Sequence, residues 1–347
     1  FSINAPFTAF KYVAINPNIN ISSDFVNRFQ EASINEENEV ELNTIDRFKN
    51  RTTSNLALSI STKVYGILPF KVGNFQAIRH VMTPRIGFSY SPNYLKNDNY
   101  FQEFNDEYYD YFSGTLIGST PRTSSKKINL SLGNVFQAKR SINNEEEKID
   151  LFSLRMNTGY DVNKEEFKLS TLNSSLRSSL KNGTNIDMNF THDFYEFNKE
   201  ESTRINKLRS IPRLTGIRLS TNFTLKGKKN DIQNDNELSE ETKNFLNDFS
   251  SNIWQSRIGV SYTLNKINPD NKIENFWLNS NTSVNVTNNW KLNYNARFNL
   301  IDNNIVRHNL TLYREIDCWE LFVDWTPNGY ARGLYFRLNL KSDMLQD

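Results

Sequence analysis

The chain has 347 residues, with 41 basic and 39 acidic residues and a formal net charge of +2. This near balance removes the main electrostatic argument for a nucleic-acid-binding protein, which needs a clustered basic excess. Aromatic residues make up 13% of the sequence, which is too many for a disordered chain. Asparagine is unusually frequent, with 51 residues, and it favours turns over helix interiors.

The sequence offers little support for catalytic or metal-binding chemistry. Cys318 is the single cysteine, which excludes an internal disulfide framework and a zinc site built on several cysteines. The three histidines, His80, His192 and His308, are far apart in the sequence. No base and orienting third group are indicated for Cys318, and no convergent set of Ser, His and acid is evident. We therefore predict that the protein is not an enzyme and holds no cofactor or metal.

The strongest signal is strict alternation of apolar and polar residues. Residues 290–300 alternate without exception, and residues 217–226 and 254–265 repeat the pattern. Because successive side chains of a strand point to opposite faces, each segment predicts a strand with one apolar and one polar face. No apolar run approaches the 18 residues of a membrane-spanning helix.

Taken in chain order, the pattern predicts fourteen strands of roughly 10–14 residues each. They lie near 11–25, 54–65, 78–91, 126–138, 149–162, 168–181, 184–196, 215–226, 254–265, 277–287, 290–301, 305–316, 319–325 and 331–341. Strands of soluble domains average about 5–6 residues, whereas a tilted membrane-spanning strand needs about 9–11. We therefore predict an all-β fold over residues 1–347, an antiparallel transmembrane β-barrel that forms part of a larger barrel.

The predicted connections between strands are either short turns or long links, and the two kinds are expected mainly on opposite sides of the membrane. The short ones are the hairpin turns Asn182-Gly183, Asn288-Asn289 and Asn303-Asn304, and the long ones are 26–53, 92–125, 197–214 and the charged insertion at about 227–253. If the chain end is periplasmic, strand parity places the first three long links outside and the insertion in the periplasm. The aromatic and acidic segment 100–112 is expected to fold onto neighbouring loops.

The polar positions of the predicted strands carry basic residues that we expect to face the lumen, namely Arg218, Arg257, Lys291, Arg297 and Arg307. One interpretation is a cationic lumen that contacts anionic groups such as lipid phosphates. The other is an ordinary solvated lumen, in which such charges pair with acidic residues, namely Asp161, Asp187, Glu315, Glu320 and Asp324. The sequence leaves both open.

The apolar positions are expected to face lipid, including Leu219, Phe223, Val260, Leu264, Leu292, Tyr294 and Phe298. The five tryptophans, Trp254, Trp277, Trp290, Trp319 and Trp325, lie at or near strand ends and predict an interfacial aromatic girdle. Pro17 and Pro84 fall inside predicted strands. Since proline donates no backbone hydrogen bond, these sites should be bulges or weakened pairings.

Two segments resemble a known family. They are YGILPFKVGNFQAIRHVMTPRIGFSYSP (residues 65–92) and CWELFVDWTPNGYARGLYFRLNLK (residues 318–341). Both resemble the C-terminal barrel region of the outer-membrane lipopolysaccharide-assembly protein, the LptD family, in its Bacteroidetes-type branch. The resemblance implies a translocon in the bacterial outer membrane. In that family a periplasmic domain receives lipopolysaccharide from periplasmic bridge proteins, and a large barrel, plugged by a lipoprotein, then releases it sideways between its first and last strands.

The resemblance also assigns places to parts of this chain. It implies that the chain is the C-terminal portion of the barrel, with earlier strands before Phe1. The strand 331–341 would then be the last strand and one lip of the lateral gate, formed by Gly333, Leu334, Tyr335, Phe336, Arg337, Leu338 and Asn339. Two other functions also fit the alternation: a porin or substrate-specific transporter barrel, and a glycan-binding surface β-protein whose apolar face is an internal core.

Overall fold

The structure is a computed structural model. It describes residues 1–36, 39–72, 75–104, 106–142, 145–180, 183–227, 253–287, 289–316, 319–328 and 331–340. All regular elements in these ranges are strands, and every pairing between them is antiparallel, which confirms the predicted all-β antiparallel fold. No helix within them is long and apolar enough to cross a membrane.

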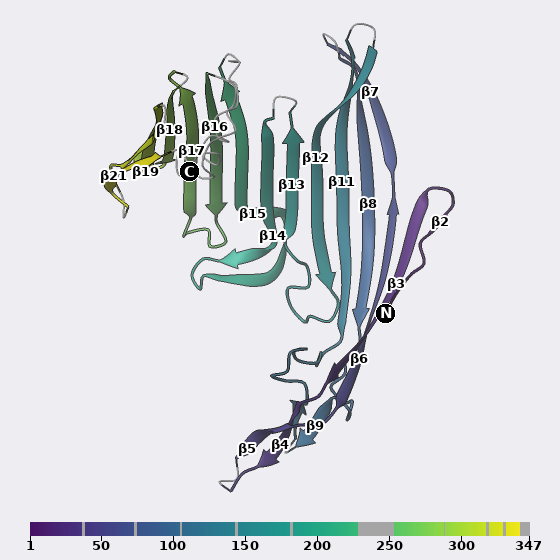
Figure 1. The fold of residues 1–347 in the computed structure, drawn as a ribbon. Coiled ribbons are helices and arrows are strands. Elements are labelled where there is room, and N and C mark those ends of the chain that lie inside the picture. Colours follow the sequence, from purple (N-terminus) through teal and green to yellow (C-terminus); the bar gives the residue numbers. More distant parts are fainter. Residues whose placement is uncertain are drawn as a thin grey trace, which may run out of the picture.

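One large curved sheet dominates the molecule (Figure 1). Its strands are β1 (Ser2–Asn4), β2 (Phe7–Ala9), β3 (Val13–Val26), β6 (Lys49–Thr62), β7 (Val64–Val72), β8 (Phe75–Ser91), β11 (Ser125–Ile142), β12 (Glu145–Asp161), β13 (Leu172–Ser179), β14 (Asn185–Asn198), β15 (Thr203–Lys226), β16 (Trp254–Asn265), β17 (Ile273–Asn285), β18 (Trp290–Asn299), β19 (Asn304–Ile316), β20 (Trp319–Thr326) and β21 (Gly333–Leu340). From β3 to β21 each strand pairs with its neighbours in chain order, apart from the small hairpins described below.

Two places in the sheet are each filled by two strands in line. Strands β1 and β2 both pair with β3, and β6 and β7 both pair with β8, so the 17 strands occupy fifteen places. The fourteen predicted strands account for all places except that of β1 and β2. Each of those strands has only three residues, and the two are separated by Ala5 and Pro6, so no alternation is long enough to predict them.

The two prolines that were predicted to lie inside strands are each opposite an interruption in the neighbouring strand. Pro17 in β3 faces the gap between β1 and β2, and Pro84 in β8 faces the gap between β6 and β7. On their other sides the two residues remain in register with Leu58 and Leu132. Because proline has no backbone N–H to donate, it fits best where the ladder is already open. The predicted weakened pairings are confirmed at both positions.

The sheet is open in the described part of the chain. No pairing there joins β21 to β1 or β2, and Figure 1 shows β21 and the pair β2–β3 at opposite edges of the sheet. Strand directions agree with the predicted parity. The connections that follow β3, β8 and β14 share one end of the sheet, while residues 227 and 253, which bound the charged insertion, lie at the other end. Residues 228–252 and Cys318 lie outside the described residues.

A small cap projects from the end of the sheet where β3 and β8 finish (Figure 1). We define the cap as residues 27–48 and 92–124. It contains the hairpins β4 (Phe29–Ile34) with β5 (Val40–Ile45), and β9 (Phe101–Phe104) with β10 (Glu107–Asp110). The Gln102 side chain bonds both backbone groups of Ala32, at 2.7 and 2.9 Å. The prediction that segment 100–112 folds onto a neighbouring loop is therefore confirmed.

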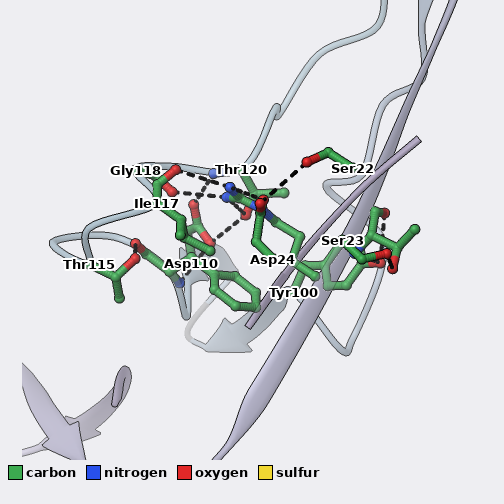
Figure 2. Close-up of polar contacts among 12 residues, drawn as sticks. Ser22, Ser23, Asp24, Tyr100, Asp110, Thr115, Ile117, Gly118 and Thr120 are labelled. Atoms are coloured by element: carbon green, nitrogen blue, oxygen red, sulfur yellow. Dashed lines mark hydrogen bonds and ion pairs between the residues drawn. The ribbon is translucent and has the colours of Figure 1, made fainter. Parts of the chain in front are cut away.

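The cap is held to the sheet by the buried side chain of Arg51 in β6. Its Nη1 donates to Gly118 O at 2.9 Å and Thr120 Oγ1 at 3.1 Å, and its Nη2 donates to Asp24 Oδ2 and Ile117 O, both at 3.1 Å. The buried carboxylate of Asp110 accepts bonds from the backbone and the hydroxyl of Thr120, as Figure 2 shows. An aromatic core of Tyr100, Phe101 and Phe112 lies beside this network.

The predicted long link 197–214 is wrong. Strand β14 continues to Asn198 and β15 begins at Thr203, so the link is a turn of four residues, 199–202. The hairpin is irregular between Thr191 and Glu196, where the register shifts three times, and its end bends away from the sheet (Figure 1). The bulges break the alternation on which the prediction depended, which is why these strand segments read as loop.

Candidate functional site

The polar positions of successive strands form rows across one face of the sheet. In one row the registered residues are Asn222, Gly259, Asn279, Arg297 and Arg307. In the adjacent row they are Thr224, Arg257, Asn281, Asn295 and Asn309. The two rows therefore bring three arginines and five asparagines from β15–β19 together on one surface.

A hollow of about 650 Å³ lies over these rows. Its polar lining consists of Asn222, Thr224, Arg257, Asn279, Asn281, Asn295, Arg297, Arg307 and Asn309, with Gly259 between them. We call it the arginine–asparagine hollow. The described lining residues include three guanidinium groups and no carboxylate. All three arginine side chains are exposed, so the described residues form an open depression with basic side chains.

Gly259 gives the hollow part of its floor. A Cβ atom at this position would lie 2.7 Å from Asn222 Oδ1, closer than real Cβ contacts. The Asn222 side chain therefore lies across the space that any other residue at 259 would fill. Glycine weakens a strand interior because it packs nothing, and its presence often marks close approach of another group. Sequence analysis missed Gly259, although its place between polar positions of an alternating strand is a usable signal.

The hollow adjoins an aromatic ring. The Arg297 guanidinium lies 4.3 Å from the centre of the Trp277 ring. Trp277 is registered with Ser261 and Asn299, so it lies on the polar face, and its predicted place in an interfacial girdle is wrong. The predicted strand began at residue 277, whereas β17 begins four residues earlier, at Ile273. Trp277 is therefore an interior residue of β17 and not its first residue.

The other tryptophans agree with the girdle pattern. Trp254, Trp290 and Trp319 begin β16, β18 and β20, which run in one direction, so all three lie at the same end of the sheet. Trp325 lies near the other end of β20. Their registered partners place these four side chains on the face opposite the hollow.

The five predicted lumen-facing residues all lie on the polar face, and the structure brings three of them together. Arg218 is registered with Thr263, outside the hollow. Lys291 is buried, with its ammonium 5.7 Å from the centre of the Tyr313 ring. In the described part of the chain, no carboxylate pairs with Arg297 or Arg307. By contrast, Arg177 Nε lies 3.0 Å from Asp187 Oδ1, as the solvated-lumen interpretation expects.

The opposite face of the sheet is apolar. The predicted lipid-facing residues all lie on it, namely Leu219, Phe223, Val260, Leu264, Leu292, Tyr294 and Phe298. Exposed apolar side chains continue across the first strands, including Leu56, Leu58 and Ile60 of β6 and Ile86 and Phe88 of β8. Soluble monomers rarely expose apolar patches larger than a few hundred Å². The polar face instead contains buried side chains such as Gln255, Ser283 and Asn293.

The predicted gate residues form the last described strand. β21 pairs with β20 along its whole length, from Gly333 opposite Thr326 to Leu340 opposite Trp319. Leu334, Phe336 and Leu338 are exposed on the apolar face. Tyr335, Arg337 and Asn339 alternate with them on the polar face, where the Arg337 guanidinium lies 4.6 Å from the centre of the Phe322 ring.

No group of three or more His, Cys, Asp and Glu residues within the described ranges is arranged to hold a metal ion. Cys318 and Asp317 fall outside those ranges.

Comparison with known proteins shows a family match and a structural likeness. The model of a family described as "LptD protein" matches residues 1–195, which is more than half of the chain. A chain from "Structure of the FpvAI-pyocin S2 complex" is 12% identical with a TM-score of 0.27. That match covers 94% of this chain and 46% of the solved chain, so this chain spans about half the length of that relative. No curated protein matches.

Proposed function

The chain belongs to the LptD family, whose members are transport proteins and not enzymes, and from this premise we propose that it forms part of an outer-membrane translocon. In this proposal the sheet is a portion of a β-barrel that inserts lipopolysaccharide into the outer leaflet through a lateral gate. The family match over residues 1–195 is the observation that carries the proposal. The partners are lipopolysaccharide, a plug lipoprotein and the periplasmic bridge proteins that supply the lipid.

The two faces of the sheet support placement in a membrane. The apolar face is exposed over most strands and is bordered at one end by Trp254, Trp290 and Trp319. A membrane-spanning barrel turns such a face to lipid and places its aromatic residues at the interfaces. Most strands of the large sheet have 10 or more residues, which is enough to cross the hydrocarbon layer with a tilt.

The polar face supports passage of the hydrophilic part of a lipid. Its rows of asparagine and arginine give donors and acceptors in place of water, so a charged saccharide meets compatible groups there. The acyl chains need a different path, because in the described residues the apolar groups of this face are separate aromatic rings, such as those of Trp277 and Tyr313, set among polar side chains. A seam that opens sideways solves this problem by letting the acyl chains remain in the bilayer while the saccharide follows the lumen.

We place that seam at the outer edge of β21. In the described part of the chain this edge has no strand partner, and β21 pairs with β20 alone. Unpaired backbone groups are costly in lipid, so in the complete barrel the edge meets another strand when the seam is closed. Gly333 favours a weak pairing, since glycine adds no packing to the seam.

The experiment locks this seam with a disulfide. Cys318 is first changed to Ser, and Asn339→Cys is then combined with a cysteine scanned along the first strand of the full-length protein. We expect the oxidised variant to assemble and to lose lipopolysaccharide export, and the reduced variant to regain it. Export that continues with the seam locked would overturn the lateral gate and favour a porin-like path through the lumen.

A second disulfide gives the matched control. Ser220 and Ser261 are registered partners on β15 and β16, far from β21 in the sheet, so Ser220→Cys with Ser261→Cys locks a pair that is already joined. Directly opposed residues of an antiparallel pair have the separation that a disulfide needs. We expect this variant to export lipid at the parental rate in both redox states. Loss of export here would mean that oxidation itself, rather than the seam, blocks the transport.

A further inference from the structure

We propose that the arginine–asparagine hollow is a binding site for an anionic sugar, a sugar ring that carries a phosphate or a carboxylate. The proposal deepens the function proposed above and rests on it only for the source of the ligand, which would be the saccharide part of the transported lipid. The site itself follows from the arrangement of charge, amides and aromatic surface in β15–β19.

The arrangement of the arginine side chains in the hollow favours binding of an anion. Arg297 and Arg307 are direct cross-strand partners, and Arg257 lies in the adjacent row. Like charges directly opposite each other destabilise a strand pair. The described residues place no carboxylate in the hollow to offset this repulsion. A bound phosphate or carboxylate removes it, and guanidinium groups bind both anions through paired N–H donors.

The amides distinguish a sugar from a bare anion. Asn279, Asn281 and Asn295 lie beside the arginines, and in the described part of the chain their side chains make no hydrogen bond. Each amide offers both donors and an acceptor, which matches the hydroxyl groups of a sugar. Asn309 is different, because its amide is engaged with Thr326 Oγ1 at 3.0 Å. A hollow of about 650 Å³ also lies in the size range of small-molecule sites and exceeds what one phosphate fills.

The fluorescence of Trp277 can report the binding of a ligand in the hollow. Its ring is covered by the Arg297 guanidinium at 4.3 Å. An anion in the hollow attracts this guanidinium and weakens the cation–π contact, so the surroundings of the indole change when the ligand binds. Tryptophan fluorescence follows such a change directly.

The test uses full-length protein in detergent micelles, in which Trp277 is retained and every other tryptophan is changed to Phe. The probes are N-acetylglucosamine 1-phosphate, N-acetylglucosamine and inorganic phosphate. We expect a saturable fluorescence change with the sugar phosphate and affinities at least about tenfold weaker for the neutral sugar and for phosphate. Equal affinity for inorganic phosphate would overturn the sugar assignment, and equal affinity for the neutral sugar would overturn the anionic one.

Three variants connect the signal to the hollow. Arg307→Gln should weaken sugar-phosphate binding about tenfold or more. Asn279→Ala should weaken binding of the sugar phosphate and leave that of phosphate unchanged, and it keeps the test decisive if Arg307→Gln does not fold. The matched control is Arg218→Gln, on the same face outside the hollow, which should bind as the parent does. A non-saturable signal, or equal binding by Arg307→Gln and Arg218→Gln, would indicate an adventitious contact and overturn the site.

The two proposals fail separately. Loss of sugar-phosphate binding in a protein that still exports lipid would overturn this site and leave the translocon in place. Intact binding together with export that continues when the seam is locked would retain the site and overturn the lateral gate.

Discussion

Arginine has opposite environments in the cap and in the hollow. Arg51 is 5% exposed and donates to four acceptors, one of them the Asp24 carboxylate. Arg297 and Arg307 are exposed, face each other across a strand pair and have no carboxylate partner in the described ranges. A buried charge that is hydrogen-bonded to several acceptors fixes structure, whereas exposed like charges that face each other repel, and a bound anion stabilises them. We therefore assign the first to architecture and the second to recognition.

The sharpest test of this contrast is Arg51→Leu. The substitution leaves the Asp24 carboxylate and the carbonyls of Ile117 and Gly118 without their donor. Removing one member of a buried, hydrogen-bonded pair costs on the order of 3–5 kcal/mol. We expect the cap to open locally while the sheet stays folded, measured as loss of hydrogen-exchange protection in residues 92–124.

Arg28→Leu is the control for that experiment. Arg28 forms an ion pair with Asp46 in the same cap, and the two side chains are 66% and 73% exposed. Exposed pairs of this kind contribute about 0–1 kcal/mol because water screens them. Equal loss of protection in the two variants would contradict the structural role given to Arg51.

Strand β16, which lines the hollow, has one apolar and one polar face that can be compared by substitution. Val260 and Ser261 are neighbours in β16, and their side chains point to opposite faces. Val260→Lys should destabilise the protein in liposomes by about 2–4 kcal/mol if the residue lies near the bilayer midplane. Ser261→Lys places the same charge on the polar face and should cost far less. The measurement is urea unfolding, and equal costs would remove the argument that the apolar face meets lipid.

The faces were predictable from sequence, and the hollow was not. Alternation has a period of two residues, so it assigns Val260 and Arg257 to their faces without any knowledge of their neighbours. The grouping of Arg257, Arg297 and Arg307 depends on register between strands, which a single sequence does not specify. The short β1 and β2, and the bulged end of the hairpin between β14 and β15, were missed for a related reason, because interruptions and bulges break the period.

Gly259→Val tests whether the shape of the hollow matters as much as its charge. The added side chain displaces Asn222, whose Oδ1 would lie 2.7 Å from the new Cβ. Because valine suits a strand, we expect stability to change by no more than about 1 kcal/mol, while sugar-phosphate affinity falls about tenfold. Gly87→Val is the matched control. Gly87 lies on the polar face of β8, where the nearest atoms to a new Cβ are at an ordinary 3.8 Å. Unchanged sugar-phosphate binding by Gly259→Val would contradict the proposal that Gly259 shapes the hollow.

The smallest effect concerns a third basic residue, Lys49, which the cap holds against aromatic rings. Its Nζ lies 3.3 Å from the centre of the Tyr111 ring and 4.6 Å from that of Phe29. Burial lowers the pKa of Lys49, with partial opposition from the nearby Glu31 carboxylate. The charged form is thus less favourable in the folded cap than in the unfolded chain.

The sign of the pH effect follows from that direction. Where the unfolded chain holds the proton more tightly, stability rises with pH. The cost of burying the Lys49 ammonium is therefore complete below the folded-state pKa, and it disappears as pH rises to the ordinary lysine value. We expect Lys49→Met, which keeps the apolar contact, to lose this gain, so the parent cap should become more resistant to proteolysis relative to the variant as pH rises towards the ordinary lysine pKa of 10.5. Lys96→Met, at an exposed position in the same cap, controls for the loss of one charge. If the stability of both variants responds to pH in the same way, the aromatic surroundings of Lys49 have no part in the stability of the cap. The contrast between buried and exposed cations then depends on Arg51 and the arginines of the hollow alone.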